Sequence, residues 1–537
     1  MSKANETGNR PDPDSSAPEM TQAAPESIGG IVRRIGPGLI IAGSIVGSGE
    51  LIATTISGAK AGFWLLWLIV LGCVIKVFVQ VEFGRHTIIS GETTLYSLNT
   101  LPGPRVRAVN WIVWYWLIMF LVIIGQQGGI VGGVGQALAI SAPITSDGKL
   151  YNQIVDAETQ LQVRQRYVEL FQERNADDPN YDAKLVQLQQ GVEATQQRLD
   201  ELGEKPGVFY DDRLWATIIA VGTSALLIVG RYGLIQFFAT AFVGTFTVIT
   251  IVNLLMLQSD ATLGINASEL ADGLKFRLPP PEETHGTENP LVIALAAFGI
   301  IGVGAAELVA YSYWCLEKGY ARFTGPRDDT PAWAERARGW MRVMHWDVFL
   351  SMAVYTFATA AFYLLGAATL GRFRMDAKGT EMIRSLSVMF EPVFGSFAQE
   401  MFLFGAIAVL YSTFFVAAAS NSRVLADCCR VFGVDMSTEQ RRQRYVQLFS
   451  GLLPLISLVV YLFVQAPKAL VLASGVMQAL MLPMLSFAAL YYRYRRIDVR
   501  LKPSSVWDAF LWTSGIAMLI AGVTLFVLKV SEFAGGG

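Results

Sequence analysis

Long apolar runs alternate with short polar segments from residue 36 to the end of the chain. An α-helix needs about twenty apolar residues to cross a bilayer, and it satisfies its own backbone polar groups where lipid cannot. The pattern therefore predicts an all-α membrane protein with eleven transmembrane helices. The predicted spans are 36–58, 62–83, 108–140, 214–230, 232–257, 290–314, 343–370, 398–425, 446–465, 467–491 and 506–529.

Basic residues gather in alternate loops between these spans. They precede the first span at 33–34, the third at 105–107 and the ninth at 441–444. Because Lys and Arg concentrate in cytoplasmic loops, the amino terminus is expected inside and the carboxyl terminus outside. Basic residues at 372–384 fall on the opposite side of this assignment. We expect an integral protein of the bacterial inner (plasma) membrane.

Polar stretches divide the apolar chain into segments. Residues 1–32 are rich in Ser, Pro, Ala and Glu, which predicts a disordered cytoplasmic tail. Residues 142–212 carry apolar residues at helical spacing on both sides of a turn at 177–180, which predicts an external helical hairpin insertion. This hairpin is either a solvated spacer or a docking module for an external partner. The other predicted segments are 33–141 (spans 1–3), 213–257 (spans 4 and 5), 258–289 (an external loop), 290–491 (spans 6–10) and 492–537 (span 11 and the carboxyl terminus).

Composition narrows the class of function. The chain is 53% hydrophobic and only 16% charged, so the lipid bilayer is an expected partner. Its net charge of −2 gives no reason to expect binding to nucleic acid. The four cysteines form no CxxC motif, which argues against a disulfide framework or a thiolate metal site. The sequence has no phosphate-binding loop, HExxH motif or nucleophile–base pattern, so no enzymatic activity is expected.

One eight-residue phrase occurs twice inside apolar runs. Residues 46–53 read VGSGELIA, and residues 303–310 read VGAAELVA. A glutamate at bilayer depth costs about 2.5–3.5 kcal/mol or more, and each flanking glycine weakens a helix by about 1 kcal/mol. The phrase can recur by chance, or its glutamates can be structural carboxylates. The preferred interpretation is an internal repeat that brings two broken helices together at a midplane site.

The chemistry of that site follows from its oxygen atoms. Glu50 and Glu307 are the predicted principal ligands, together with backbone carbonyls freed at Gly47 and Gly304. Such a site suits a hard cation such as magnesium, calcium or manganese, which would be the substrate, so that no cofactor is expected. Possible supporting residues are Ser48, Gly49, Gln126, Gln127, Asn421 and Gln478.

Several motifs carry a resemblance to a known family. They are GPGL at 36–39, GSGE at 47–50, SGAKAGFWLLW at 57–67, GRY at 230–232 and LP at 482–483. Together they resemble the NRAMP family of divalent-metal transporters. The resemblance implies the LeuT-type fold, with a 5+5 inverted repeat, broken helices 1 and 6, and alternating access.

The sequence departs from the family at the metal-site motifs. Gly47 and Glu50 stand where the family has Asp and Asn, and residues 304–307 read GAAE where it has Met-Pro-His-Asn. Gln126 and Gly129 replace acids of the family's proton pathway. Without the thioether and the histidine, the preference for soft transition metals is expected to disappear.

Three functions therefore remain open. The first is a secondary-active transporter of a hard divalent cation. The second is a transporter of a small organic amine or amino-acid-like solute, in which the two glutamates would hold an ammonium group. The third is a sensor or scaffold that transports nothing.

Overall fold

The computed structural model describes residues 21–207, 209–230, 232–280, 289–377, 379–436 and 438–535. Residues 1–20 of the predicted tail and 281–288 of the predicted external loop lie outside them. Within the predicted tail, Ser27 caps a short helix, α1 (Ile28–Arg34), by accepting a hydrogen bond from the amide of Gly30 at 3.2 Å. Helical structure therefore begins before the predicted boundary at residue 32.

Among the described residues, nine helical segments are long and apolar enough to cross a membrane. They are α4 (Leu66–Ser90), α6 (Trp111–Ser141), α9 (Asp211–Val229), α12 (Pro290–Ile300) with α13 (Ala305–Lys318), α15 (Pro331–Leu365) with η3 (Gly366–Gly371), α18 (Ala398–Val431), α19 (Glu439–Val464), α20 (Pro467–Tyr491) with η7 (Tyr492–Arg496), and α21 (Ser505–Gly535). The all-α membrane class is confirmed.

Two further apolar segments lie among these helices. One consists of α2 (Pro37–Ile45), the π-helical η1 (Ser48–Thr54) and α3 (Thr55–Ala61), and the other is α10 (Tyr232–Leu257). They would raise the number of spans to the predicted eleven, which stays a prediction.

Short elements connect the spans. They are α5 (Thr94–Asn99), the antiparallel strands β1 (Arg105–Val106) and β2 (Val109–Asn110), α11 (Ala267–Gly273), α14 (Tyr320–Thr324), η4 (Gly379–Glu381), α16 (Met382–Ser387), η5 (Val388–Phe390), α17 (Glu391–Phe394), η6 (Gly395–Phe397) and η8 (Val499–Leu501).

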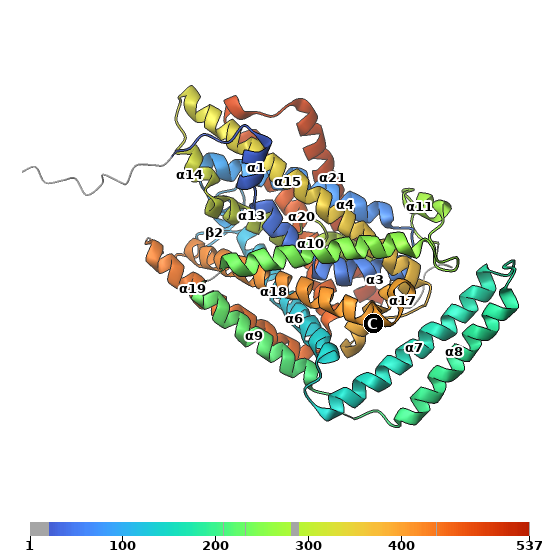
Figure 1. Ribbon diagram of the computed structural model, residues 1–537. Coiled ribbons are helices and arrows are strands. Elements are labelled where there is room, and N and C mark those ends of the chain that lie inside the picture. The colour runs from blue at the N-terminus through green and yellow to red at the C-terminus, as the bar shows by residue number, and fades with distance from the viewer. Residues whose placement is uncertain are drawn as a thin grey trace, which may run out of the picture.

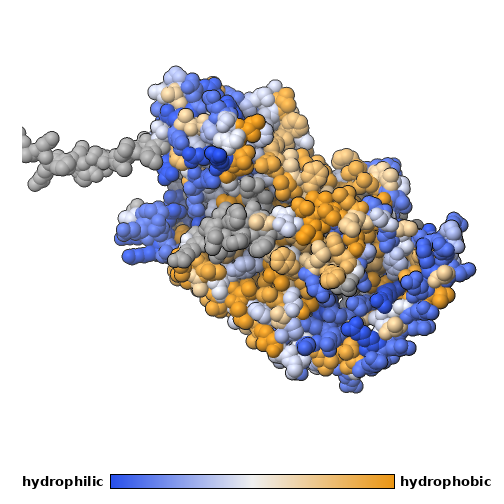
Figure 2. Space-filling model, viewed as in Figure 1, coloured by the Kyte–Doolittle hydropathy of each residue, from blue (hydrophilic) through white to orange (hydrophobic). Residues whose placement is uncertain are grey.

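Helices α6 and α20 pack closely against each other. Further helices surround this pair, with α9, α18 and α19 against α6 and with α12 and α21 against α20. Exposed apolar side chains such as Ile218 of α9, Phe463 of α19 and Phe526 of α21 point outward. Figure 2 shows an apolar surface between two hydrophilic regions, as expected for a protein whose middle faces lipid.

A helical hairpin projects from one end of the molecule. It consists of α7 (Ser146–Arg174) and α8 (Tyr181–Leu202), which pack side by side (Figure 1). Thr145 caps α7 by accepting a hydrogen bond from the amide of Gly148 at 2.9 Å. The hairpin surface is hydrophilic (Figure 2). Its place outside the membrane stays a prediction.

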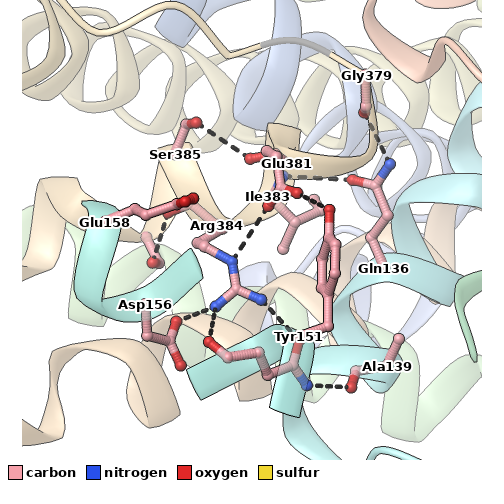
Figure 3. Close-up of polar contacts among 12 residues, drawn as sticks. Gln136, Ala139, Tyr151, Asp156, Glu158, Gly379, Glu381, Ile383, Arg384 and Ser385 are labelled. Carbon is pink, nitrogen blue, oxygen red and sulfur yellow. Dashed lines mark hydrogen bonds and ion pairs between the residues drawn. The ribbon is translucent and has the colours of Figure 1, made fainter. Parts of the chain in front are cut away.

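A polar network joins α7 to the segment between α15 and α18 (Figure 3). Arg384 of α16 is 3% exposed; it donates to Asn152 Oδ1 at 2.7 Å and pairs with Asp156, both on α7. Glu381 pairs with Arg384 at 3.3 Å and accepts a hydrogen bond from Tyr151 of α7. Burial raises the pKa of Glu381, and the Tyr151 hydroxyl opposes that shift. Arg384 is therefore the shared partner of two carboxylates from different elements.

Replacing Arg384 should loosen the hairpin. Arg384→Met leaves Asp156 and Glu381 without the guanidinium group that pairs with both. We expect the contact between the hairpin and the rest of the protein to lose about 1–3 kcal/mol of stabilising free energy, because an unpaired polar group keeps its desolvation cost. The measurement is the rate of limited proteolysis within 142–212, which should rise. Arg198→Met, at an exposed position on α8, is the matched control. An unchanged cleavage rate would mean that apolar contacts hold the hairpin instead.

Candidate functional site

The first helix break lies at Val46 and Gly47, between α2 and η1. Gly47 is the N-cap residue that directly precedes η1, and α18 packs against it. A Cβ atom at Gly47 would lie 1.8 Å from Thr413 Oγ1, so that only glycine fits at this crossing. Hydroxyls of Thr54 and Thr55 donate to the carbonyl oxygens of Gly49 and Glu50 at 3.0 and 3.2 Å, which satisfies backbone groups of the π-helical turn.

The second break separates α12 from α13. Gly302 has a φ of +56°, a left-handed conformation that favours glycine, and Gly304 caps the start of α13. The two copies of the repeated phrase therefore occupy the same place: Gly47 and Gly304 precede a restarting helix, and Glu50 and Glu307 are its third residues. That spacing is also the one at which a glutamate can cap its own helix.

Both carboxylate oxygens of Glu50 accept hydrogen bonds in this structure. The side chain is fully buried, and the amide of Gly47 donates to Oε2 at 3.4 Å. The hydroxyl of Thr359 on α15 donates to Oε1 at 3.1 Å. Glu50 thus caps η1 and binds α15, and it does not line the cavity described next.

Glu307 is in a different situation. Its Oε2 atom is buried and has no hydrogen-bond partner in the described structure. The side chain lines a cavity of about 30 Å³ between the two breaks and helices α6 and α18. The cavity is lined by Ile45, Ser48, Gly49, Ile123, Gln126, Gln127, Ile130, Ile300, Ala306, Glu307, Ala310, Trp314, Thr413, Val416, Ala417, Ser420 and Asn421. One ionisable oxygen without a hydrogen-bond partner therefore belongs to a side chain that lines a small cavity of mixed polar and apolar residues.

A hydrogen-bond chain fixes one wall of this cavity. Gln126 of α6 donates to Ser48 Oγ at 3.2 Å, and its Oε1 accepts from Ser474 at 2.8 Å and from Gln478 at 3.0 Å. Gln478 of α20 in turn accepts from the amide of Ala306 at 3.0 Å, which caps α13. The chain connects both breaks to α6 and α20.

The structure brings together only part of the predicted site. Ser48, Gly49, Gln126, Gln127, Glu307 and Asn421 line the cavity. Gly47, Glu50, Gly304 and Gln478 lie outside its lining, the glycines as helix caps and Gln478 as the partner of Gln126. Our expectation that both glutamates face one cavity is not met by Glu50, because the Gly47 amide and Thr359 hold its carboxylate.

Two features of the site were missed in the sequence. Thr413, Ala417 and Ser420 line the cavity from α18 beside the predicted Asn421, and their helical spacing was an available signal. Lys76 lies in the middle of α4, and its ammonium group binds carbonyl oxygens at the second break. A lysine inside the apolar run 62–83 was a signal for an intramembrane function.

The start of the first broken helix is also fixed by a carboxylate. Asp347 of α15 is fully buried, and it accepts the amides of Gly36 at 2.9 Å and of Gly38 at 2.5 Å. Since the first amides of a helix have no partner within it, Asp347 serves as their cap. α15 therefore binds the first broken helix at Gly36 and Gly38 as well as at Glu50.

Comparison with known proteins identifies the family. Residues 210–528, more than half of the chain, match the family model described as natural resistance-associated macrophage protein-like, or Nramp. The chain belongs to the Nramp family. Nramp proteins are transporters of divalent metal ions, not enzymes. No curated protein sequence matches this Nramp chain.

Solved structures show the same fold. The Nramp chain superposes on a manganese transporter from Eremococcus coleocola with a TM-score of 0.57 and 15% identity, over 96% of this chain and 91% of that one. It also matches MhsT in complex with L-phenylalanine, with a TM-score of 0.50 and 13% identity, over 91% and 97% of the two chains. At these identities the likeness shows the fold alone, which is of the LeuT type. The 5+5 layout stays a prediction.

Proposed function

We propose that this Nramp-family chain is a secondary-active transporter of a hard divalent cation of the magnesium, manganese or calcium class. The cation binds in the cavity between the two broken helices and crosses by alternating access. The observation that carries the proposal is the buried, unpartnered Oε2 of Glu307 at that cavity. A buried carboxylate oxygen without a donor, on a side chain that lines a small cavity, suits a cation ligand.

The lining chemistry supports a hard ion. The cavity residues contribute carboxylate, amide and hydroxyl oxygens from Glu307, Gln126, Gln127, Asn421 and Thr413. Within the described part of the chain, the lining includes no Met, Cys or His, the side chains that select softer metals. Among the described residues, no three His, Cys, Asp or Glu side chains cluster at a metal-binding distance, so neutral oxygens have to complete the coordination.

Glu50 enters the proposal as a ligand of another conformation. In this structure its carboxylate is held by the Gly47 amide and Thr359. Release of those two hydrogen bonds would let Glu50 join Glu307, and two carboxylates would balance the charge of a divalent ion. Residues Gly47 and Gly304 would then supply the backbone freedom at the breaks.

The size of the cavity favours an ion over an organic solute. A space of about 30 Å³ is enough for one or two water molecules. An amine or amino acid would need a larger space than this conformation provides. The match to MhsT with L-phenylalanine bound concerns the fold and does not change this preference. The sensor or scaffold alternative has no specific observation in its favour.

The orientation belongs to the same proposal. The distribution of basic residues puts the amino terminus in the cytoplasm of a bacterial cell, and the hairpin at 142–212 on the external side. An external partner of the hairpin stays a hypothesis that no observation supports.

Ion selectivity tests the proposal. Cadmium should lose the advantage that sulfur ligands give it, so that magnesium, manganese and calcium bind with at least comparable affinity. Calorimetry on the purified protein and uptake into vesicles would measure this. Tight binding of cadmium, without binding or uptake of magnesium and calcium, would overturn the proposed ligand set.

A further inference from the structure

Lys76 is a cation built into the core of the transmembrane region. It lies in the middle of α4, its side chain is 0% exposed, and its neighbours in the sequence are apolar. A charged group at this depth persists only where its surroundings balance it. The contacts of its ammonium group therefore show what this place in the fold binds.

Those contacts are backbone oxygens freed by the second helix break. The ammonium nitrogen donates to the carbonyl of Phe298 at 2.6 Å and to that of Ile301 at 2.5 Å. It also lies 4.9 Å from the centre of the Phe298 ring, within the range of a cation–π contact. Carbonyl groups at a helix end carry partial negative charge, and α12 ends here because Gly302 turns the chain away.

These contacts leave the ammonium group among oxygen atoms and an aromatic ring. A helix end and an aromatic face together make a place that suits one monovalent cation. In this chain the cation is covalently attached to α4.

We propose that the Lys76 ammonium group occupies a monovalent-cation site at the second break, so that divalent-cation binding needs no free sodium, potassium or ammonium ion. The part that concerns divalent ions rests on the proposed function. The occupancy of the carbonyl site by a tethered ammonium group does not, because it can be measured on the protein without a metal.

The experiment removes the Lys76 side chain and supplies a free ammonium ion in its place. Lys76→Ala takes away the side chain beyond Cβ, and propylammonium has the shape and charge of the part removed. Lys76→Met keeps most of the side-chain length and removes the charge, so little space is left for an added amine. Lys529→Ala, at an exposed position near the end of α21, is the control for general effects of the amine. All variants are purified with propylammonium present, which is then dialysed away.

Wild-type manganese affinity should be the same in sodium, potassium and N-methylglucamine buffers. Lys76→Ala should have a lower melting temperature and a manganese affinity at least tenfold weaker than the wild type. Propylammonium should restore both values. Propanol should restore neither, and propylammonium should have no effect on Lys76→Met or Lys529→Ala. A sodium requirement in the wild type, full manganese affinity in Lys76→Met, or failure of propylammonium to raise the melting temperature of Lys76→Ala would overturn the proposal.

The melting temperature also separates this proposal from the proposed function. If the wild type binds no divalent ion, the proposed function fails. The tethered-cation site is then supported if propylammonium raises the melting temperature of Lys76→Ala and not that of Lys529→Ala, and it is rejected otherwise.

Discussion

Glu307→Gln should lower the affinity for a divalent cation by tenfold or more, about 1.4 kcal/mol, while the protein without metal remains as stable as the wild type or becomes more stable. The carboxylate oxygen that is lost has no partner in the described structure, so its removal breaks no hydrogen bond. An amide also costs less to bury than an unpaired carboxylate. Binding by calorimetry and melting temperature without metal, measured on the same samples, test the two halves of this expectation.

Glu50→Gln is the matched comparison for stability without metal, because it makes the same chemical change at the same place in the other repeat. Its carboxylate accepts hydrogen bonds from Gly47 and Thr359, so we expect a loss of about 1 kcal/mol in stability without metal. Opposite signs of the two stability changes would separate the unpartnered carboxylate of Glu307 from the hydrogen-bonded carboxylate of Glu50. If Glu307→Gln binds cations normally and Glu50→Gln does not, the cation site has been placed at the wrong glutamate.

Gly58→Ala should be strongly destabilising, although it adds only a methyl group. A Cβ atom at Gly58 of α3 would lie 2.1 Å from the carbonyl oxygen of Tyr363, and one at Gly366 would lie 2.2 Å from that of Thr55. The two backbones meet at this crossing, and neither contact is with a side chain that can rotate away. Overpacking of this kind costs about 1–3 kcal/mol or more. The melting temperature and the monodisperse fraction after purification should both fall.

Gly222→Ala on α9 provides the comparison. No atom lies within 4 Å of its Cβ position, so the helix preference for Ala should leave stability unchanged or raise it by up to about 1 kcal/mol. A Gly58→Ala protein as stable as Gly222→Ala would show that α3 and α15 are not in backbone contact.

The apolar pattern predicted where the helices lie better than where they end. The predicted span 108–140 nearly coincides with α6, whereas 343–370 covers only part of α15, which begins at Pro331. Residues 331–342 contain Glu, Arg and Trp, so the helix continues beyond the apolar stretch and hydropathy does not detect it. The breaks were predictable because glycines interrupt two apolar runs.

The partners of the glutamates could not be predicted. Glu50 and Glu307 have similar neighbours in sequence and the same position in a restarting helix. They differ because Thr359, 309 residues away in the chain, donates a hydrogen bond to one of them. Periodicity and composition do not contain such a contact. Lys76 was visible in the sequence, but its role depends on carbonyl groups that only the second break exposes.

The attachment of the first broken helix has a consequence for motion. Asp347 holds the start of α2, Thr359 holds η1, and the crossing at Gly366 holds α3, and all three residues lie on the single helix formed by α15 and η3. The two halves of that helix cannot swing apart without bending α15. The halves of the second broken helix pack mainly on different partners, α12 on α20 and α13 on α4. Relative movement of the two halves therefore meets less resistance at the second break, around Gly302, than at the first.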